Sequence, residues 1–135
     1  MTTTPTTRPL RLYLAGPMTG LPDFNRPAFH AAAAELRAAG YQVVNPVELD
    51  ESEPITDPDG PGAWEHYMRR DIPHLCKCDA LALLPGWTES QGAQLEEEIA
   101  FRLSMPIETT DEWIEWQQTA DDWLRFDHPQ LRPAP

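Results

Sequence analysis

Three consecutive carboxylates, Glu96, Glu97 and Glu98, lie in the segment 91–104, whose composition predicts a helix. At about 100° per residue, Glu96 falls within about 60° of five residues on the apolar face, Gly92, Ala93, Ile99, Ala100 and Leu103. A carboxylate on such a face is unfavourable unless it is paired, hydrogen-bonded or used in chemistry. The preference of glutamate for early helical turns accounts for Glu97 and Glu98 but poorly for Glu96. The pattern therefore favours a functional role for Glu96.

The start of the same helix has the composition of an anion site. Ser90 is the natural N-cap, and Gly86 and Gly92 allow the backbone to approach a ligand closely. A helix N-terminus with a hydroxyl at its cap can bind phosphate, although an ordinary cap has the same sequence. Together with Glu96, Ser90 indicates a site with an anion end and a carboxylate end. A buried carboxylate beside a bound sugar can act as a nucleophile in glycosyl transfer.

Strands and helices alternate along the chain in a way that predicts how these residues meet. An apolar strand over 10–15, an alanine-rich helix over 27–39 and a strand over 41–44 form a unit with a parallel strand pair and a right-handed crossover. A near-continuous apolar strand follows at 79–84, and a short fourth strand at 106–108. In open α/β folds, ligands bind where such strands end. Asp71 and the turn 13–18 are therefore expected to line the same edge as Glu96.

The remaining segments set the expected domain boundaries. We predict a disordered lead over 1–9, one α/β domain over 10–126 and a tail over 127–135. The domain is predicted to have three layers, with a mostly parallel Rossmann- or flavodoxin-like sheet of about four to five strands and helices on both faces. Its last helix, at about 111–126, carries three tryptophans that favour packing over ligand stacking, Trp113, Trp116 and Trp123.

Two proline-containing stretches interrupt this pattern. Residues 47–62 contain five Pro or Gly breakers and six acidic residues, which predict a long loop, either a lid or a disordered segment. Pro73 predicts that the helix starting at Ala63 breaks around Asp71, which could then cap a short helix over 72–76.

Composition limits the classes of partner. The 135 residues carry a net charge of −12, which argues against a nucleic acid polymer or an anionic membrane as the main partner but permits a small phosphorylated ligand. No apolar run approaches about 18 residues, and no secretory signal is present, so we expect a cytoplasmic protein. Cys76 and Cys78 lack a second ligand cluster, which favours buried reduced thiols over a zinc site. No cofactor motif or metal site is expected.

A specific resemblance rests on four motifs: Tyr-Leu-Ala-Gly-Pro at 13–17, Asp71, Asp-Ala at 79–80, and Ser-x-Gly-Ala-x-x-Glu-x-x-x-Ala at 90–100. Over roughly 10–108 the chain resembles the nucleoside 2-deoxyribosyltransferase superfamily. More closely, it looks like a small branch of uncharacterised phage- and actinobacteria-associated domains placed beside this superfamily, DUF4406-like. The first and last motifs are specific in combination and weak apart.

The resemblance implies a role for each matching residue. Glu96 matches the nucleophile that attacks the anomeric carbon of a nucleoside and forms a covalent glycosyl-enzyme, which a second base or water then resolves. Asp71 matches an aspartate near the base and its proton transfers, and Tyr13 matches the substrate-cradling loop together with Gly16, Pro17 and Met18. Ser90 matches a serine that touches the 5′-phosphate in nucleotide-hydrolysing relatives. Where transferases carry an aspartate after the third strand, this chain has two further substrate-binding candidates, Gly86 and Trp87.

The expected function is therefore cleavage or transfer at the N-glycosidic bond of a nucleoside or nucleoside 5′-monophosphate. The alternative is a non-catalytic module that binds a nucleotide on the same fold. A third possibility is an interaction role with the C-terminal helix as the contact surface. The resemblance also implies a homodimer or larger homo-oligomer.

Overall fold

The computed structural model describes residues 9–125, and side chains from residue 9 to residue 118. The predicted lead, apart from Pro9, and the predicted tail at 127–135 lie outside the described residues. Four strands form one parallel sheet: β1 (Arg11–Ala15), β2 (Gln42–Val44), β3 (Ala80–Leu83) and β4 (Ile107–Thr109). Their order is β2-β1-β3-β4, with every neighbouring pair parallel. The predicted parallel α/β sheet is confirmed.

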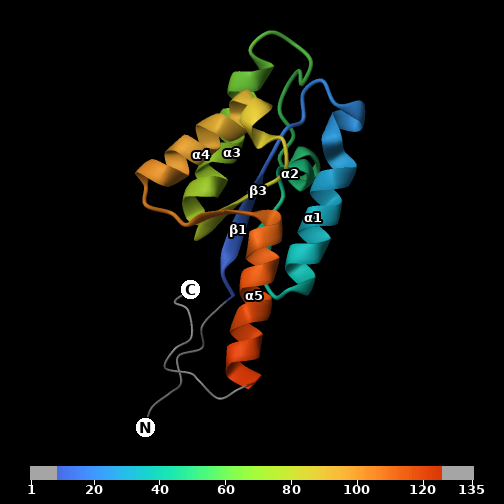
Figure 1. Ribbon diagram of the computed structural model, residues 1–135. Helices are drawn as coiled ribbons and strands as arrows, with labels where there is room; N and C mark the ends of the chain where they lie inside the picture. Colours follow the sequence, from blue (N-terminus) through green and yellow to red (C-terminus); the bar gives the residue numbers. More distant parts are fainter. Residues whose placement is uncertain (1–8, 126–135) are drawn as a thin grey trace.

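Five α-helices in the described part of the chain surround this sheet. They are α1 (Arg26–Ala38), α2 (Pro46–Ser52), α3 (Ala63–Lys77), α4 (Gln91–Arg102) and α5 (Thr110–Arg125), with short 3-10 turns at Pro22–Asn25 and Trp87–Glu89. As Figure 1 shows, α1 and α5 lie on one side of the sheet and α3 and α4 on the other, which confirms the three-layer arrangement. None of the helices described is long and apolar enough to cross a membrane.

The alternation of side chains along β1 divides the core into two clusters. Leu12 and Leu14 point to the first face, where they pack with residues of α1 and with Trp113 of α5. Tyr13 and Ala15 point to the second face, where they pack with residues of α3 and α4, including Leu75, Ala93 and Ala100. Trp113 is buried in the first cluster, so the predicted packing role of this tryptophan is confirmed.

The predicted loop over 47–62 is wrong in its first part, which forms helix α2. The Asn45 side chain caps this helix by accepting a hydrogen bond from the Val47 N–H at 3.0 Å, and Pro46 occupies its first turn. Val47 and Leu49 are buried against the domain, which stabilises a helix of only seven residues. Residues 53–62 remain irregular, as predicted.

The predicted break around Asp71 is also wrong, because α3 continues through Pro73 to Lys77. Proline removes one hydrogen bond to the preceding turn, at the carbonyl of Arg69. Both Pro73 and Arg69 are exposed, so water can reach that carbonyl. The opposite side of the helix stays continuous and buries Met68, Asp71 and Leu75 in one stripe. Tertiary packing thus outweighs the local helix-breaking signal.

One of the two cysteines also departs from expectation. Cys78 is buried and free, as predicted, and burial raises the pKa of its thiol to about 11. Cys76 is free but exposed, because it lies on the solvent side of the last turn of α3. The prediction of two buried thiols is therefore correct for Cys78 only.

Candidate functional site

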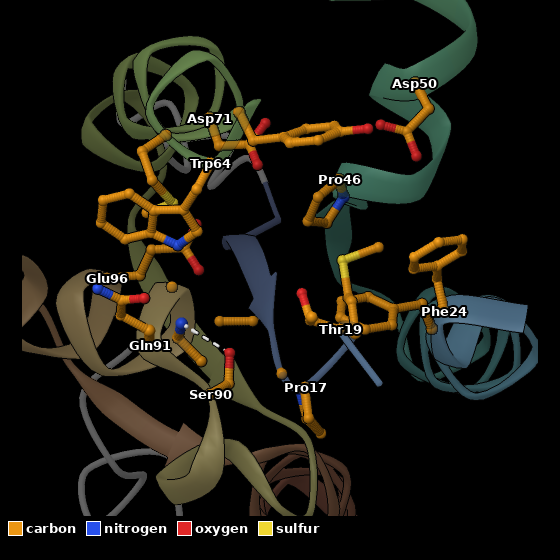
Figure 2. A pocket seen from close by; sticks show the side chains of 18 of the residues that line it. Pro17, Thr19, Phe24, Pro46, Asp50, Trp64, Asp71, Ser90, Gln91 and Glu96 are labelled. Carbon is orange, nitrogen blue, oxygen red and sulfur yellow. Dashed lines mark hydrogen bonds between the residues drawn. The ribbon is translucent and has the colours of Figure 1, made fainter. Parts of the chain in front are cut away.

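A cavity of about 780 Å³ opens at the carboxyl ends of the strands, between the loop after β1 and the helices α1, α2, α3 and α4. Figure 2 shows Ser90, Gln91 and Glu96 of the α4 region on one side, with Thr19, Phe24 and Pro46 across the cavity. Trp64 and Asp71 of α3 form a third wall. The location is the edge at which open α/β folds bind ligands.

Glu96 is the central polar group of this cavity. It shares the buried side of α4 with Ala93 and Ala100, and its residue is 6% exposed. Leu103, predicted on the same stripe, is instead 55% exposed, because the helix ends at Arg102 and Leu103 is its C-cap. Glu98 is exposed and forms an ion pair with Arg102 at 2.8 Å. The three glutamates are therefore separated as their helical angles predicted.

A short hydrogen bond holds Glu96 in place. The fully buried hydroxyl of Tyr13 on β1 donates to Oε2 of Glu96 at 2.6 Å. Burial raises the pKa of Glu96 to about 8, with the negative charge of Asp71 adding to the rise and the Tyr13 hydrogen bond opposing it. Burial, followed by the charges of Glu96 and Asp71, raises the pKa of Tyr13 well above its ordinary value. Tyr13 therefore remains a hydrogen-bond donor across the physiological pH range.

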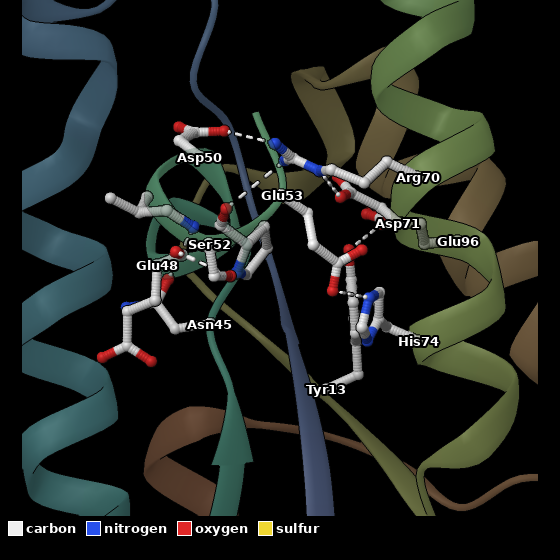
Figure 3. A network of polar contacts seen from close by, with 12 residues as sticks. Tyr13, Asn45, Glu48, Asp50, Ser52, Glu53, Arg70, Asp71, His74 and Glu96 are labelled. Atoms are coloured by element: carbon white, nitrogen blue, oxygen red, sulfur yellow. Dashed lines mark hydrogen bonds and ion pairs between the residues drawn. The ribbon is translucent and has the colours of Figure 1, made fainter. Parts of the chain in front are cut away.

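Asp71 brings a second buried carboxylate to the same wall. Its residue is 7% exposed, and burial raises its pKa while the adjacent Arg70 guanidinium opposes the rise. Arg70 donates from Nε to Oδ1 of Asp71 at 2.8 Å and from Nη1 to Oδ1 of Asp50 at 2.7 Å (Figure 3). Two carboxyl groups with raised pKa values beside one cavity can hold and exchange a proton.

The anion end is formed by the start of α4. The Oγ of Ser90 accepts a hydrogen bond from the Ala93 N–H at 3.2 Å, which makes it the N-cap of the helix, as predicted. The N–H groups of Gln91 and Gly92 precede the first intrahelical hydrogen bond, and both residues line the cavity. A Cβ on Gly92 would lie 3.4 Å from Sδ of Met68 and 3.6 Å from Nε1 of Trp64, which are ordinary van der Waals distances, so a small side chain would fit between α3 and α4.

The predicted cradle after β1 also lines the cavity, with Gly16, Pro17 and Met18. At Gly16 a Cβ would lie 2.7 Å from Cβ of Leu84, which only a glycine avoids. Tyr13 lies behind this surface and reaches the cavity through its contact with Glu96. Seven of the ten predicted site residues therefore line one cavity: Gly16, Pro17, Met18, Asp71, Ser90, Gly92 and Glu96.

Gly86 and Trp87 do not lie where substrate-binding residues were expected. Neither lines the cavity. Gly86 has φ +85°, and a Cβ there would lie 3.2 Å from Cγ of Pro17, so it shapes the turn that supports the cradle. Trp87 packs against the second core cluster. The reason is that the polypeptide turns away from the cavity after β3 and re-enters it at Glu89.

The structure adds cavity residues that sequence reasoning missed as site residues. Trp64 and Tyr67 line the cavity from α3, and Asp50 lines it from the unpredicted helix α2. Trp64, Tyr67 and Asp71 are spaced i, i+3 and i+7, a signal for a shared helix face that the expected break at Asp71 obscured. Arg70 also lines the cavity. Among the described residues, no group of three or more His, Cys, Asp and Glu side chains is placed to hold a metal ion.

Comparison with known proteins agrees with the branch that the motifs indicated. No curated protein matches the chain at a significant level. The model of a family described as "Domain of unknown function (DUF4406)" matches residues 10–109, which include the sheet, the helices α1 to α4 and every candidate site residue. Because this match covers most of the chain, the protein belongs to the DUF4406 family of domains.

Proposed function

We propose that the protein cleaves or transfers the N-glycosidic bond of a nucleoside or nucleoside 5′-monophosphate, with Glu96 as the nucleophile. One observation carries the proposal: a buried carboxylate, fixed by Tyr13 at 2.6 Å, lines a large cavity that also contains a helix N-terminus. The volume of about 780 Å³ lies within the usual range of small-ligand sites, roughly 300–1,000 Å³. The motif resemblance supports the same assignment.

The proposed reaction has two steps. A carboxylate oxygen of Glu96 attacks the anomeric carbon, the bond from carbon to the base nitrogen breaks, and the base takes the bonding electron pair and a proton from Asp71. Water or a second base then attacks the same carbon, frees the Glu96 carboxylate and returns a proton to Asp71. The reacting pair therefore needs one proton, located on Asp71, when the first step begins.

The start of α4 supports a phosphorylated substrate. The hydroxyl of Ser90 and the free N–H groups of the first helical turn offer donors to a 5′-phosphate at the positive end of the helix dipole. A nucleoside that spans from this end to Glu96 would place its base toward Asp71 and the aromatic side chains of α3. In this orientation, Trp64 and Tyr67 supply apolar surface to the base.

Chromatography of reaction products tests the proposal. Wild-type protein, Glu96→Gln and the neighbouring control Glu97→Gln are incubated with ribo- and deoxyribonucleosides and their 5′-monophosphates, with and without free base. We expect free base from wild type and Glu97→Gln, and a loss of roughly a thousandfold or more in Glu96→Gln. New nucleosides formed only with added base would identify a transferase. Turnover by Glu96→Gln at the wild-type rate would refute Glu96 as the nucleophile.

A non-catalytic binding module is the second candidate, favoured by the protonation of Glu96. With a pKa of about 8, Glu96 is mostly neutral at pH 7 in the empty site, which suits a hydrogen-bonding role better than nucleophilic attack. Incubation with a 2-fluoro-2-deoxy nucleoside separates the two candidates by intact mass. A covalent adduct supports the enzyme, whereas thermal stabilisation by nucleotides without adduct or turnover supports the binding module.

We also retain the expectation of a homodimer or larger homo-oligomer. The end of α4 presents two exposed apolar side chains, Phe101 at 69% and Leu103 at 55% exposure. Light scattering during gel filtration measures the mass directly, and a monomer at all concentrations would exclude this expectation.

A further inference from the structure

A partly buried chain of charged side chains links helix α2 to the second carboxylate of the site. The side chain of Arg70 is 7% exposed and lies between Asp71, at 10%, and Asp50, at 24%. Arg70 uses separate nitrogens for each partner, Nε for Asp71 at 2.8 Å and Nη1 for Asp50 at 2.7 Å. Its Nη2 also donates to the Pro46 carbonyl at 3.4 Å. Each of these contacts restricts the guanidinium to one orientation.

The charges of Asp50, Arg70 and Asp71 do not balance one another. Two carboxylates share one guanidinium, so the group carries a net charge of −1 when both are ionised. Removal of charges from water is costly, and a buried pair is retained only where its geometry is good or its charge is used. Tyr67 packs its ring against the guanidinium, with the Arg70 Cζ 5.2 Å from the ring centre. Several contacts therefore hold one arginine, Arg70, next to the proposed proton donor, Asp71.

Charged groups reach Asp71 from several elements. Arg70 and His74 of α3 lower the pKa of Asp71, and Asp50 of α2 raises it. His74 is itself paired with Glu53 at 2.9 Å. On the other side, Glu96 of α4 and Tyr13 of β1 interact electrostatically with Asp71. Figure 3 shows Arg70 between Asp50 and Asp71, with Glu96 and Tyr13 beyond Asp71.

We propose that Arg70 and Asp50 are positioning residues of the candidate site, which orient Asp71 and set its charge beside Glu96. This inference rests on the proposed function for its catalytic meaning, because Asp71 must carry a proton when the base leaves. Arg70 fixes one oxygen of Asp71 and attracts its negative charge. Asp50 holds Arg70 in place and offsets part of that attraction. Asp71 is thus oriented without being locked in its ionised form.

The two residues act on Asp71 with opposite sign, which distinguishes an electrostatic role from simple packing. Loss of the positive charge of Arg70 makes Asp71 harder to ionise, whereas loss of the negative charge of Asp50 makes it easier. A role in packing alone would loosen α2 in either variant and shift the titration of Asp71 the same way in both. The sign of the shift is therefore the critical observable.

A matched control exists on the same helix. Glu48 of α2 forms an ion pair with Arg37 of α1, with contacts of 2.7 and 2.8 Å. This pair also fastens α2 to the domain, but it is exposed and does not line the cavity. Glu48→Gln therefore reproduces the loss of an α2 ion pair two residues from Asp50 without a change of charge at the site.

Carbon-13 NMR of carboxyl-labelled aspartate measures the titration of Asp71 in the ligand-free protein, and Asp71→Asn identifies its resonance. Relative to wild type, we expect the titration midpoint of Asp71 to rise by about one pH unit or more in Arg70→Gln. We expect it to fall by less in Asp50→Asn and to stay unchanged in Glu48→Gln. Shifts in the same direction for Arg70→Gln and Asp50→Asn, or equal shifts for Asp50→Asn and Glu48→Gln, would overturn the proposal. If Arg70→Gln does not fold, the nearly isosteric Asp50→Asn still decides, because an upward or absent shift contradicts it.

The NMR readout does not depend on turnover, so the two proposals can fail separately. Cleavage needs one proton on the Glu96–Asp71 pair, so activity is lost on the acid side when the pair takes up a second proton. Where wild type cleaves a nucleoside, this acid side of its pH–rate profile should move with the Asp71 titration in each variant. If no nucleoside is cleaved but the opposite shifts are observed, Arg70 and Asp50 control the charge of a binding site rather than a catalytic one. If cleavage occurs without these shifts, the proposed function stands and the positioning role is refuted.

Discussion

Two buried tyrosines on opposite sides of the sheet make hydrogen bonds of the same length to very different partners. The Tyr41 hydroxyl donates at 2.6 Å to the backbone carbonyl of Trp113. The indole Nε1–H of Trp113 in turn donates to the carbonyl of Leu81 at 2.9 Å. Tyr13 donates at 2.6 Å to the carboxylate of Glu96. The first contact joins two neutral groups inside the core. The second joins a donor to a group whose charge changes near neutral pH.

This contrast shows how one sheet serves two purposes. On the face covered by α1 and α5, buried polar atoms complete backbone hydrogen bonds, and packing of apolar side chains stabilises the domain. On the face covered by α3 and α4, the apolar cluster stops at the cavity, where Glu96, Asp71 and Arg70 are buried instead. Burial of ionisable groups lowers the stability of the fold, so we expect the functional groups of the second face to reduce the free energy of unfolding.

The largest expected effect is on the pH dependence of stability. Glu96 has a pKa near 4.5 when unfolded and about 8 when folded, so its proton binds more tightly in the folded state. The contribution of this proton to the free energy of unfolding is complete below about pH 4.5 and is lost as pH rises through about 8. At about 1.4 kcal/mol per pKa unit, the loss is up to about 5 kcal/mol. Urea unfolding from pH 5 to pH 9 should show this decline in wild type and a much flatter profile in Glu96→Gln. Equal slopes in the two proteins would show that Glu96 is not buried in ionisable form.

The next effect is on catalysis and follows from Tyr13→Phe. Removal of the hydroxyl eliminates a donor to Glu96, so we expect a loss of about tenfold to a hundredfold in kcat/KM. The Glu96–Asp71 pair needs one proton, so wild-type activity should fall as pH rises through about 8. Because the Tyr13 hydrogen bond lowers the pKa of Glu96, this alkaline limb should move to higher pH in Tyr13→Phe. A downward move in the pH–rate profile would contradict the assigned role of Tyr13.

The smallest effect is expected from Tyr41→Phe, the matched change on the other face. It removes the Tyr41 hydroxyl as a donor to the Trp113 carbonyl and should reduce the free energy of unfolding by about 0.5–1.5 kcal/mol. Because Tyr41 lies remote from the cavity in the first core cluster, kcat/KM and its pH profile should stay at the wild-type values. Chemical denaturation and steady-state rates measure both quantities. A shifted pH profile in this variant would remove the functional distinction between the faces.

Local patterns identified much of the second face. The helical angle of Glu96 relative to Ala93 and Ala100 predicted its burial, because the period of a helix depends only on local geometry. Ser90 was recognisable as an N-cap for the same reason. Such signals need no knowledge of distant residues, and the structure agrees with both.

Local patterns failed where distant contacts decide the conformation. Prolines and acidic residues concealed α2, which depends on the Asn45 cap and on burial of Val47 and Leu49 against the domain. Pro73 suggested a break in α3, but packing of Leu75 on the sheet keeps the helix continuous. As a consequence, Asp50 and Arg70 were missed as parts of the site, since one lay in a supposed loop and the other beside a supposed break.

The sequence by itself determined the parallel α/β architecture, the start of α4 and the unusual position of Glu96, because these follow from periodicity and capping within short segments. Only the tertiary structure decided that Tyr13 meets Glu96 across 83 residues and that Arg70 reaches Asp50 across 20. The same holds for the cavity, whose walls come from the helices α1 to α4 and the loop after β1. Hydrogen bonds and ion pairs between distant segments depend on strand order and helix packing. No spacing within a single segment encodes them.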